Sequence, residues 1–388
     1  MTSEAAARPT TPNRILMGVP STWARGGGPA LHLPMLVEDL RLDGRCSVRT
    51  FSFGRWAEHE PLARKLWHQL VDLIRYPRVL RDAAPDLVHL NTSFDRRAIA
   101  RDLAFAAVTR LQRRRLLLKW HGSETQLLRS RSPLWRFLSR RLLACTDAIA
   151  VLSTEEARDL RAAGYRKRVC VVRNGLDLSR YSEVCDVRPK LGLPPGSRLL
   201  LFIARLIPEK GLLDTIEALH ALGAAPDVHL IVVGDGPSAL AARELVRQLE
   251  LTAHVHFVGT VSEDEAATFY RSCDILVLPT FHAEGFPMSI FQGVASGMSV
   301  VTTRIRAAAD YLTEPANCLF VPPKNPAALA RALATLLDDD QLRASMRRNN
   351  RALAERFERH RVAAEFAALY TELLGAVTAR TGPGESGS

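Results

Sequence analysis

The segment 274–297 carries the residues best placed to do chemistry. The apolar run 274–279 predicts a strand, and helical spacing of apolar residues begins at Pro287. Glu284 lies in the loop between them, at the carboxyl end of a strand, where open α/β sheets bind ligands. Free N–H groups at the start of the helix would face the same space. The pattern favours a bound sugar or anion, and an ordinary corner with a solvated glutamate is the alternative.

Two cations follow an earlier predicted strand at 199–204. Arg205 lies in the loop, and Lys210 lies where the next helix begins. A cation at a helix N-terminus opposes the helix dipole by about 0.3–1 kcal/mol unless an anion lies between them. Since side chains can neutralise a diphosphate, the loop predicts a diphosphate site. The alternative is a pair of surface charges with Glu209 as a salt-bridge partner.

Two further loops follow predicted strands of the same half of the chain. Gly236, in VVGDGPSAL, permits close approach of a ligand to the backbone, although an ordinary turn fits equally well. Thr260 and Val261 end the strand HVHFVGTV and could flank a flat base. That strand ends without the acid expected to bind a ribose in dinucleotide-binding proteins, which counts against a nicotinamide enzyme.

In the first half of the chain, KWHGSE places His121 just beyond a strand. A neutral imidazole at that edge could donate a hydrogen bond to a sugar oxygen or to a developing charge, whereas a packed or solvated histidine is the common alternative. The polar residues 91–93 end an adjacent strand, and strand-end hydrogen bonds explain them more simply. Asn174 and Gly175 are interpreted as a turn.

The composition describes a globular protein of two domains. A chain of 388 residues exceeds the ~250–300 residues at which single cores stop growing. Its six cysteines are scattered, with neither C-x-x-C pairs nor metal spacing, so no disulfide framework or zinc site is expected. No apolar run approaches the ~20 residues that span a bilayer, and the N-terminus lacks the apolar core of a signal peptide. A reducing cytoplasm is the expected location.

The charge is unevenly divided between the halves. Residues 1–190 hold 34 Lys and Arg against 19 Asp and Glu, a balance of +15, and residues 191–388 hold 18 against 22, a balance of −4. Thirteen basic residues lie within 96–141, where RSPLWRFLSRRLL mixes arginines with apolar side chains. Such a stretch can lie on an anionic membrane surface, so a peripheral location on the inner face of the membrane is possible. An arginine-rich helix packed on its own domain is the alternative.

Strands and helices alternate through both halves, which predicts two domains with open parallel sheets. We expect a disordered N-terminus at 1–13, domains at 14–190 and 191–377, and a disordered tail at 378–388. The segment CDVRPKLGLPPGSR, rich in proline and glycine, is the expected linker. Closing helices are expected at 326–337 and 341–377, and the last one may pack back on the first domain.

Taken together, the motifs resemble those of the family-4 retaining glycosyltransferases. The glycine loop ending at Gly28, KWHGSE, VVRNGLD, FIARLIPEKG, VVGDGP, VHFVGTV and EGFPMSIFQ occur in the family's order over nearly the whole chain. The resemblance implies an α/β chain of the GT-B fold, with two Rossmann-like domains whose parallel sheets face a central cleft. It also implies a nucleotide-diphosphate sugar as co-substrate, a sugar or glycolipid acceptor, no other cofactor and no obligatory metal.

The resemblance also implies roles for individual residues. Arg205 and Lys210 would neutralise the leaving diphosphate, Gly28 would let the backbone approach it, and Glu284 and His121 would hydrogen-bond the donor sugar near the reacting centre. The remaining positions that match the family's binding residues are Met288 and Ser289 for the diphosphate and Gly236, Thr260, Val261, Gly285, Phe286 and Gln292 for the sugar and nucleotide.

Gln292 departs from the family's pattern. The family places a second glutamate eight residues after the first, where its carboxylate accepts hydrogen bonds from the ribose. The amide of Gln292 keeps an acceptor oxygen but loses the charge, which should weaken that contact by about 1–2 kcal/mol. Gln292→Glu is therefore expected to keep activity and to lower the donor Michaelis constant.

Two other functions remain open from the residues alone. A nucleotide-sugar epimerase would share the phosphate cations and the two domains, but would act on the donor without an acceptor. A nucleic-acid-binding protein would use the basic charge, but the arginines are not interleaved with stacking aromatics, which make up 6% of the chain. No nucleic-acid partner is therefore expected.

Overall fold

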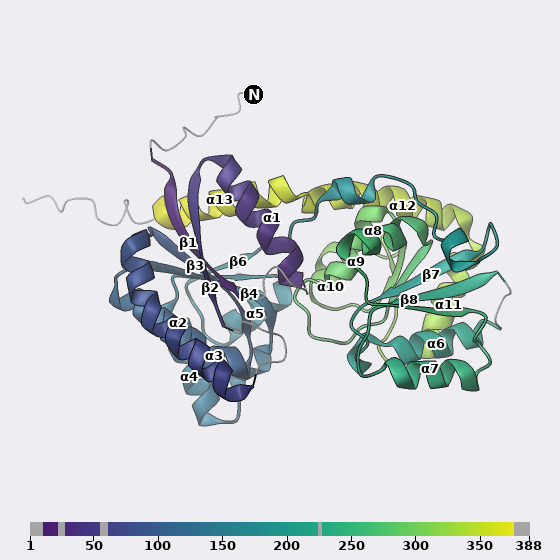
Figure 1. The fold of residues 1–388 in the computed structure, drawn as a ribbon, viewed down its shortest axis with the longest axis horizontal. Helices are drawn as coiled ribbons and strands as arrows, with labels where there is room; N and C mark the ends of the chain where they lie inside the picture. Colours follow the sequence, from purple (N-terminus) through teal and green to yellow (C-terminus); the bar gives the residue numbers. More distant parts are fainter. Residues whose placement is uncertain (1–10, 22–27, 55–60, 224–226, 376–388) are drawn as a thin grey trace, which may run out of the picture. The chain divides into compact units, whose positions relative to one another are not determined.

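The computed structural model describes residues 11–21, 28–54, 61–223 and 227–375. Within them the chain forms two compact units. Unit 1 comprises residues up to Gly175 together with the chain from Arg359 onward, and unit 2 comprises Leu176–Glu358. Each unit is built on a six-stranded parallel sheet (Figure 1).

The sheet of unit 1 has the strand order β2-β1-β3-β4-β5-β6. Its strands are β1 (Asn13–Pro20), β2 (Cys46–Phe53), β3 (Leu87–Phe94), β4 (Arg115–Ser123), β5 (Ala148–Val151) and β6 (Arg168–Val171). The first three pair in register with Ile15 opposite both Val48 and Leu87. The central strands β1, β3, β4 and β5 are largely buried on both faces, whereas the edge strands β2 and β6 have exposed residues.

Helices cover both faces of this sheet. They are α1 (Gly28–Asp43), α2 (Leu62–Ala83), α3 (Arg96–Leu111), α4 (Pro133–Cys145), α5 (Thr154–Ala162) and α13 (Arg359–Gly375), with a 3₁₀ turn at Thr125–Arg129. Alternate strand residues enter two separate cores: Leu16 packs with residues of α2–α5, whereas Ile15 packs with α1 and α13. In Figure 1, α13 runs beside α1 on this second face.

The sheet of unit 2 has the strand order β12-β11-β10-β7-β8-β9. Its strands are β7 (Arg198–Ile203), β8 (Val228–Val233), β9 (Val255–Gly259), β10 (Ile275–Leu278), β11 (Ser299–Thr302) and β12 (Leu319–Phe320). All the pairings are parallel, so their carboxyl ends lie along one edge.

The helices of unit 2 also cover both faces of its sheet. Figure 1 shows α6, α7 and α11 on one face and α8, α9 and α12 on the other. The helices are α6 (Leu212–Ala221), α7 (Ala239–Gln248), α8 (Glu263–Ser272), α9 (Met288–Ser296), α10 (Arg306–Tyr311), α11 (Pro326–Asp338) and α12 (Asp340–Ala354), with 3₁₀ turns at Leu178–Tyr181, Pro189–Leu191, Pro208–Lys210 and Glu355–Phe357.

The expected α/β alternation is confirmed, and two details differ. The closing helix expected at 341–377 is broken, because the chain leaves α12 through a 3₁₀ turn and Glu358 takes an extended backbone (φ −56°, ψ 133°) before α13 begins. The expected linker at 185–198 packs within unit 2, where Arg188 pairs with Asp274 at 3.2 Å. Strands β2 and β12 were not predicted from the sequence.

The division of the chain also differs from the boundary expected at 190/191. The chain passes from unit 1 to unit 2 after Gly175 and returns at Arg359. Arg359 opens α13, and its guanidinium binds Asp39 of α1 at 2.5 Å. The expected disordered segment at 1–13 overlaps β1 at Asn13, and residues 1–10 and 376–388 lie outside the described part of the chain.

Candidate functional site

The strand order of unit 2 brings four of the predicted loops to one edge of its sheet. The loops after β10, β7, β8 and β9 carry Glu284, Arg205, Gly236 and Thr260, and these strands are neighbours in that order. Arg205 and Thr260 are exposed, and Val261 is half-buried beside Thr260. The edge therefore collects the groups expected to bind a nucleotide sugar.

Lys210 and Glu284 form an ion pair at this edge. Nζ of Lys210 lies 2.5 Å from Oε1 of Glu284, and the lysine side chain is 5% exposed against 31% for the glutamate. Lys210 is thus neither a surface charge nor a partner of Glu209. It lies at the end of a 3₁₀ turn before α6, so the carboxylate of Glu284 is the anion that offsets its charge near the helix start.

His282 belongs to the same cluster, although sequence reasoning missed it. Burial lowers the pKa of its imidazole, the carboxylate of Glu284 opposes that shift, and the charges of Lys210 and Arg205 add to it. The backbone N–H of Glu284 donates to the carbonyl of His282 at 2.7 Å. The feature of the sequence that could have identified His282 is its position in the strand-to-helix loop, two residues before Glu284.

The glycine loop after β8 packs directly on the loop that carries Arg205. A Cβ at Gly236 would lie 2.6 Å from the carbonyl oxygen of Leu206, and Gly236 has φ +155°. The Leu206 N–H donates to Asp235 at 2.9 Å, and Ser238 N–H donates back to Leu206 at 2.8 Å. Contact between two loops of the protein therefore explains this glycine without a ligand.

The residues at the start of α9 are mostly buried. Gly285, Phe286 and Met288 are buried, and Ser289 is half-buried. The Phe286 ring stacks on Phe291 at 3.8 Å, so this side chain belongs to the core.

Gln292 lies in α9 with its side chain turned toward α8. The hydroxyl of Tyr270 donates to its Oε1 at 3.1 Å, and the residue is 6% exposed. A hydrogen bond from Gln292 lowers the pKa of the Glu263 carboxyl, although burial raises that pKa more. The amide is therefore already engaged, and a carboxylate lies beside it.

In unit 1, His121 is held by Asn91 of the adjacent strand. Nδ2 of Asn91 donates to the Gly18 carbonyl at 3.1 Å, so its Oδ1 accepts from Nε2 of His121 at 2.8 Å. Nδ1 of His121 has no hydrogen-bond partner among the described residues. The nitrogen left for a ligand is thus an acceptor. Gly28 opens α1, and the rest of the predicted glycine loop lies outside the described residues.

A buried lysine lies two residues before His121. Nδ1 of His32 accepts from the Gly175 N–H at 2.9 Å, so a neutral ring carries its proton on Nε2. Nε2 lies 2.9 Å from Nζ of Lys119, which in turn donates to Oδ1 of Asn174 at 3.1 Å. This arrangement favours an uncharged amine at Nζ, and burial lowers the pKa of Lys119 well below its usual value. Asn174 is more than a turn residue.

Comparison with known families decides the classification of the chain. Residues 48–180 match the family described as Glycosyltransferase Family 4, and residues 185–353 match Glycosyl transferases group 1. The chain belongs to the glycosyltransferases that these two family models describe. It is 31% identical over 253 residues to D-inositol 3-phosphate glycosyltransferase of Corynebacterium glutamicum (62% of this chain, 60% of that protein). It is 26% identical over 259 residues to a putative teichuronic acid biosynthesis glycosyltransferase of Bacillus subtilis (65% and 61%).

These matches span less than two thirds of the relatives' own length. Solved structures extend the likeness of fold to nearly the whole chain. Sucrose-phosphate synthase from Thermosynechococcus elongatus superposes with a TM-score of 0.76 at 20% identity, covering 94% of this chain and 100% of that one. Alr3699/HepE of Anabaena, solved with UDP, gives 0.72 at 19% identity, covering 92% and 100%. The fold is GT-B, as expected.

Proposed function

We propose that the protein is a glycosyltransferase that moves a sugar from a nucleotide-diphosphate donor to a glycan or glycolipid acceptor. The observation that carries the proposal is the Lys210–Glu284 pair at the carboxyl edge of the sheet. A diphosphate sugar presents an anion and hydroxyl groups side by side. A cation and a carboxylate in contact match both, since the cation binds phosphate and the carboxylate accepts from hydroxyls.

The proposed reaction retains the anomeric configuration. The bond from the anomeric carbon to the β-phosphate breaks while a bond to the acceptor oxygen forms on the same face. The acceptor proton goes to the leaving phosphate, whose charge Arg205 and Lys210 neutralise without a metal. Unpartnered Nδ1 of His121 would accept a hydrogen bond from a sugar hydroxyl. Relatives named for transfer to inositol 3-phosphate and for teichuronic acid biosynthesis support a polyhydroxylated acceptor.

The test is release of nucleoside diphosphate from UDP- and GDP-sugars, with and without acceptors, in buffer containing a chelator. Acceptor-dependent release with an unchanged anomeric configuration in the product supports the proposal. Interconversion of the donor sugar without an acceptor would instead indicate an epimerase. Failure to bind any nucleotide sugar contradicts the proposal, and an inverted product contradicts its stereochemical part.

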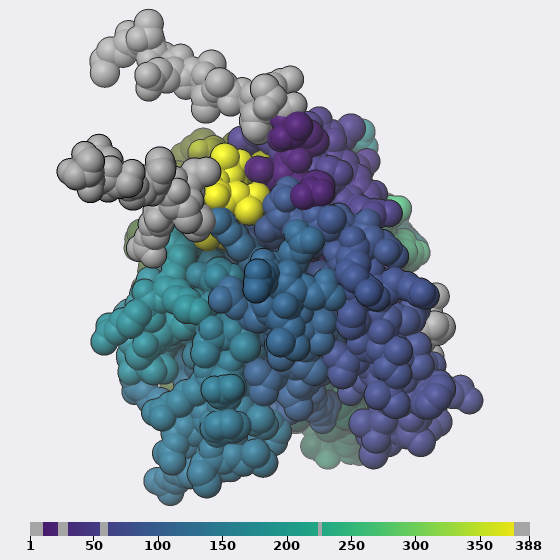
Figure 2. Space-filling model, turned by 90° about the vertical axis from the view of Figure 1, so that its left-hand side faces the viewer, coloured from purple at the N-terminus to yellow at the C-terminus, as the bar shows by residue number. Residues whose placement is uncertain are grey.

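We further propose that unit 1 docks on an anionic membrane surface. No helix in the described ranges has the length and apolarity to cross a bilayer. Large apolar side chains are nevertheless exposed along α2, with Trp67 at 62% and Ile74 at 68%, and Phe137 of α4 is exposed at 59%. Arg64 and Arg75 flank this stretch of α2, and Arg136 precedes Phe137 in α4. Figure 2 shows the face over which the blue surfaces of α2 and α3 adjoin that of α4.

Exposed apolar side chains flanked by arginines are suited to the boundary between lipid headgroups and acyl chains. Other residues of α4, such as Leu142, pack on the core, so the packed-helix interpretation of RSPLWRFLSRRLL applies to that face, and the membrane proposal concerns the exposed face alone. Together with a cytoplasmic location, this surface would bring the enzyme to a glycolipid acceptor. Vesicles that contain anionic lipid should retain the protein at low salt, and neutral vesicles should not.

A further inference from the structure

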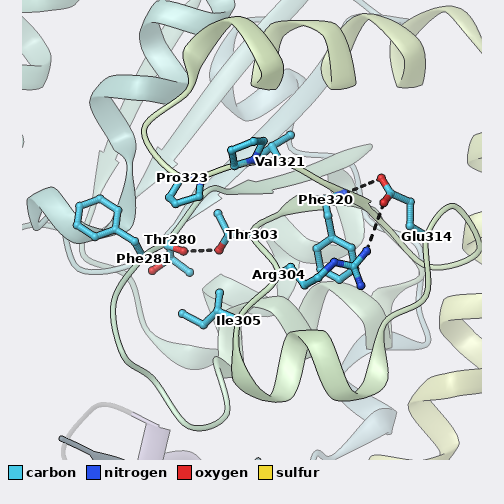
Figure 3. Close-up of a pocket in the computed structure, with 10 residues that line it drawn as sticks. Thr280, Phe281, Thr303, Arg304, Ile305, Glu314, Phe320, Val321 and Pro323 are labelled. Carbon is cyan, nitrogen blue, oxygen red and sulfur yellow. Dashed lines mark hydrogen bonds and ion pairs between the residues drawn. The ribbon is translucent and has the colours of Figure 1, made fainter. Parts of the chain in front are cut away.

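A cavity of about 450 Å³ lies at the carboxyl ends of β10, β11 and β12, within unit 2. Figure 3 shows the side chains that line it. They are Thr280, Phe281, Thr303, Arg304, Ile305, Glu314, Phe320, Val321, Pro322 and Pro323. None of them belongs to the residues expected to bind the donor. The volume falls in the range of about 300–1,000 Å³ that is usual for small-molecule sites.

One end of the cavity is polar. The Arg304 guanidinium lies 4.1 Å from the centre of the Phe320 ring, and Nη2 lies 3.5 Å from Oε2 of Glu314. The other carboxylate oxygen of Glu314 accepts from the Phe320 N–H at 3.0 Å. The ring and the carboxylate hold the guanidinium, and Glu314 is the one ion-pair partner of Arg304 within the described part of the chain. Arg304, 60% exposed, keeps other N–H donors for a ligand.

The opposite end is apolar. Figure 3 places Phe281 across the cavity from Arg304 and Glu314, with Thr280 and Thr303 between. Pro322 and Pro323 also line the cavity. The Thr303 hydroxyl donates to the Thr280 carbonyl, and this hydrogen bond joins the loop after β11 to the loop after β10.

We propose that this cavity binds one pyranose unit of a saccharide. A pyranose has an apolar C–H face, which the phenyl and proline rings can cover, and an edge of neighbouring hydroxyls. Those hydroxyls need a donor and an acceptor side by side, and the Arg304–Glu314 pair supplies both. Arg304 is the one cation among the lining residues and is already paired, so the cavity suits an uncharged polyol better than a phosphate, whereas the candidate donor site adds Arg205 to its own pair.

The cavity shares a loop with the candidate donor site. The Phe281 N–H and the Thr280 hydroxyl donate to the carbonyl of Glu209 at 2.9 and 3.1 Å, and Glu209 precedes Lys210. The same loop continues to Glu284. A bound pyranose would therefore belong to the acceptor or product chain, an assignment that rests on the proposed function.

The experiment measures binding of the methyl glycosides of glucose, galactose and mannose to the full chain by saturation-transfer NMR, with UDP in excess. At least one glycoside should bind without displacement by UDP. Arg304→Ala should weaken that binding about tenfold, the loss expected for one charged hydrogen bond. Arg331→Ala, at an exposed arginine of α11, is the control and should leave binding unchanged.

Three results would overturn the inference: no glycoside binds, UDP displaces the glycoside, or Arg304→Ala binds it as tightly as the parent. Loss of UDP binding in Arg304→Ala would assign the cavity to the donor and would also overturn it. Failure of the parent chain to bind any nucleotide contradicts the proposed function instead, and leaves glycoside binding to be judged on its own signal.

Discussion

Nε2 of His32 lies 2.9 Å from Nζ of Lys119, a lysine buried in the core of unit 1. Nζ of Lys119 lies 4.9 Å from the centre of the Phe366 ring of α13. Among the described residues, no carboxylate forms an ion pair with Lys119. Burial without a compensating charge lowers the pKa of Lys119 well below 10.5, so folding favours loss of its proton.

This relationship predicts a pH dependence of stability. Between the lowered folded pKa and the unfolded value of 10.5, the unfolded chain binds one more proton than the folded chain. The destabilisation of the folded state by burial of Lys119 is therefore largest at low pH and decreases as the pH rises toward 10.5. The free energy of unfolding of the parent, relative to Lys119→Met, should rise by up to about 1.4 kcal/mol per pH unit in this window.

Denaturant unfolding of both proteins from pH 7 to pH 10 measures this difference. Lys65→Met removes a lysine from the outer helix α2 and serves as the control. A difference between the parent and Lys119→Met that stays constant with pH would show that Lys119 is charged in the folded state.

The exposed apolar residues of α2 provide the second prediction. Trp67→Ala combined with Ile74→Ala should weaken binding to anionic vesicles by about tenfold or more, because each buried apolar side chain contributes about 1.5–3 kcal/mol. Vesicle sedimentation at low salt measures the effect. Leu240 of α7 is 80% exposed in unit 2, and Leu240→Ala is the matched control. Equal retention of all three proteins would rule out α2 as the docking surface.

Gln292 provides the third prediction, which the structure modifies. A glutamate at 292 would lie beside the Glu263 carboxyl, whose pKa burial already raises, so Gln292→Glu alone should lower the melting temperature by like-charge repulsion. The double variant Gln292→Glu with Glu263→Gln removes that repulsion. It should melt near the parent and bind the donor more tightly by about 1–2 kcal/mol. Thermal unfolding and donor Michaelis constants test both variants, and a double variant as unstable as the single one contradicts the interpretation.

Gly236 provides the fourth prediction, which tests whether this glycine is needed for loop packing in the absence of a ligand. Gly236→Ala places a Cβ against the Leu206 carbonyl at a strained φ, so the free energy of unfolding should fall by about 2 kcal/mol or more without any nucleotide present. Chemical denaturation gives the value. Gly223→Ala is the control for strain alone, since Gly223 has φ +77° and an added Cβ there meets open space. Equal losses in the two variants would show that loop packing adds nothing.

Periodicity and strand-end loops were sufficient to predict the α/β fold and the meeting of the candidate loops at one edge of the sheet, because parallel strands align their carboxyl ends. Partners of side chains were not predictable. The partner of Lys210 is Glu284, 74 residues away, and no local pattern encodes that pairing. The break before α13 was also missed, since helical apolar spacing continues on both sides of Glu358. His282 was overlooked because a single histidine in a loop carries no spacing signal.

The most direct test of the account is the affinity of UDP and GDP for the parent, Arg205→Ala and Lys210→Ala, measured by titration calorimetry, with Arg331→Ala as the control. Loss of one charged contact to a diphosphate should weaken binding about 10- to 100-fold. Arg205 is exposed, so Arg205→Ala should fold as the parent does. We expect the parent and Arg331→Ala to bind at least one of the two nucleotides with equal affinity, and Arg205→Ala and Lys210→Ala to bind it much more weakly. Equal affinity in all four proteins, or no binding by the parent, would contradict this expectation.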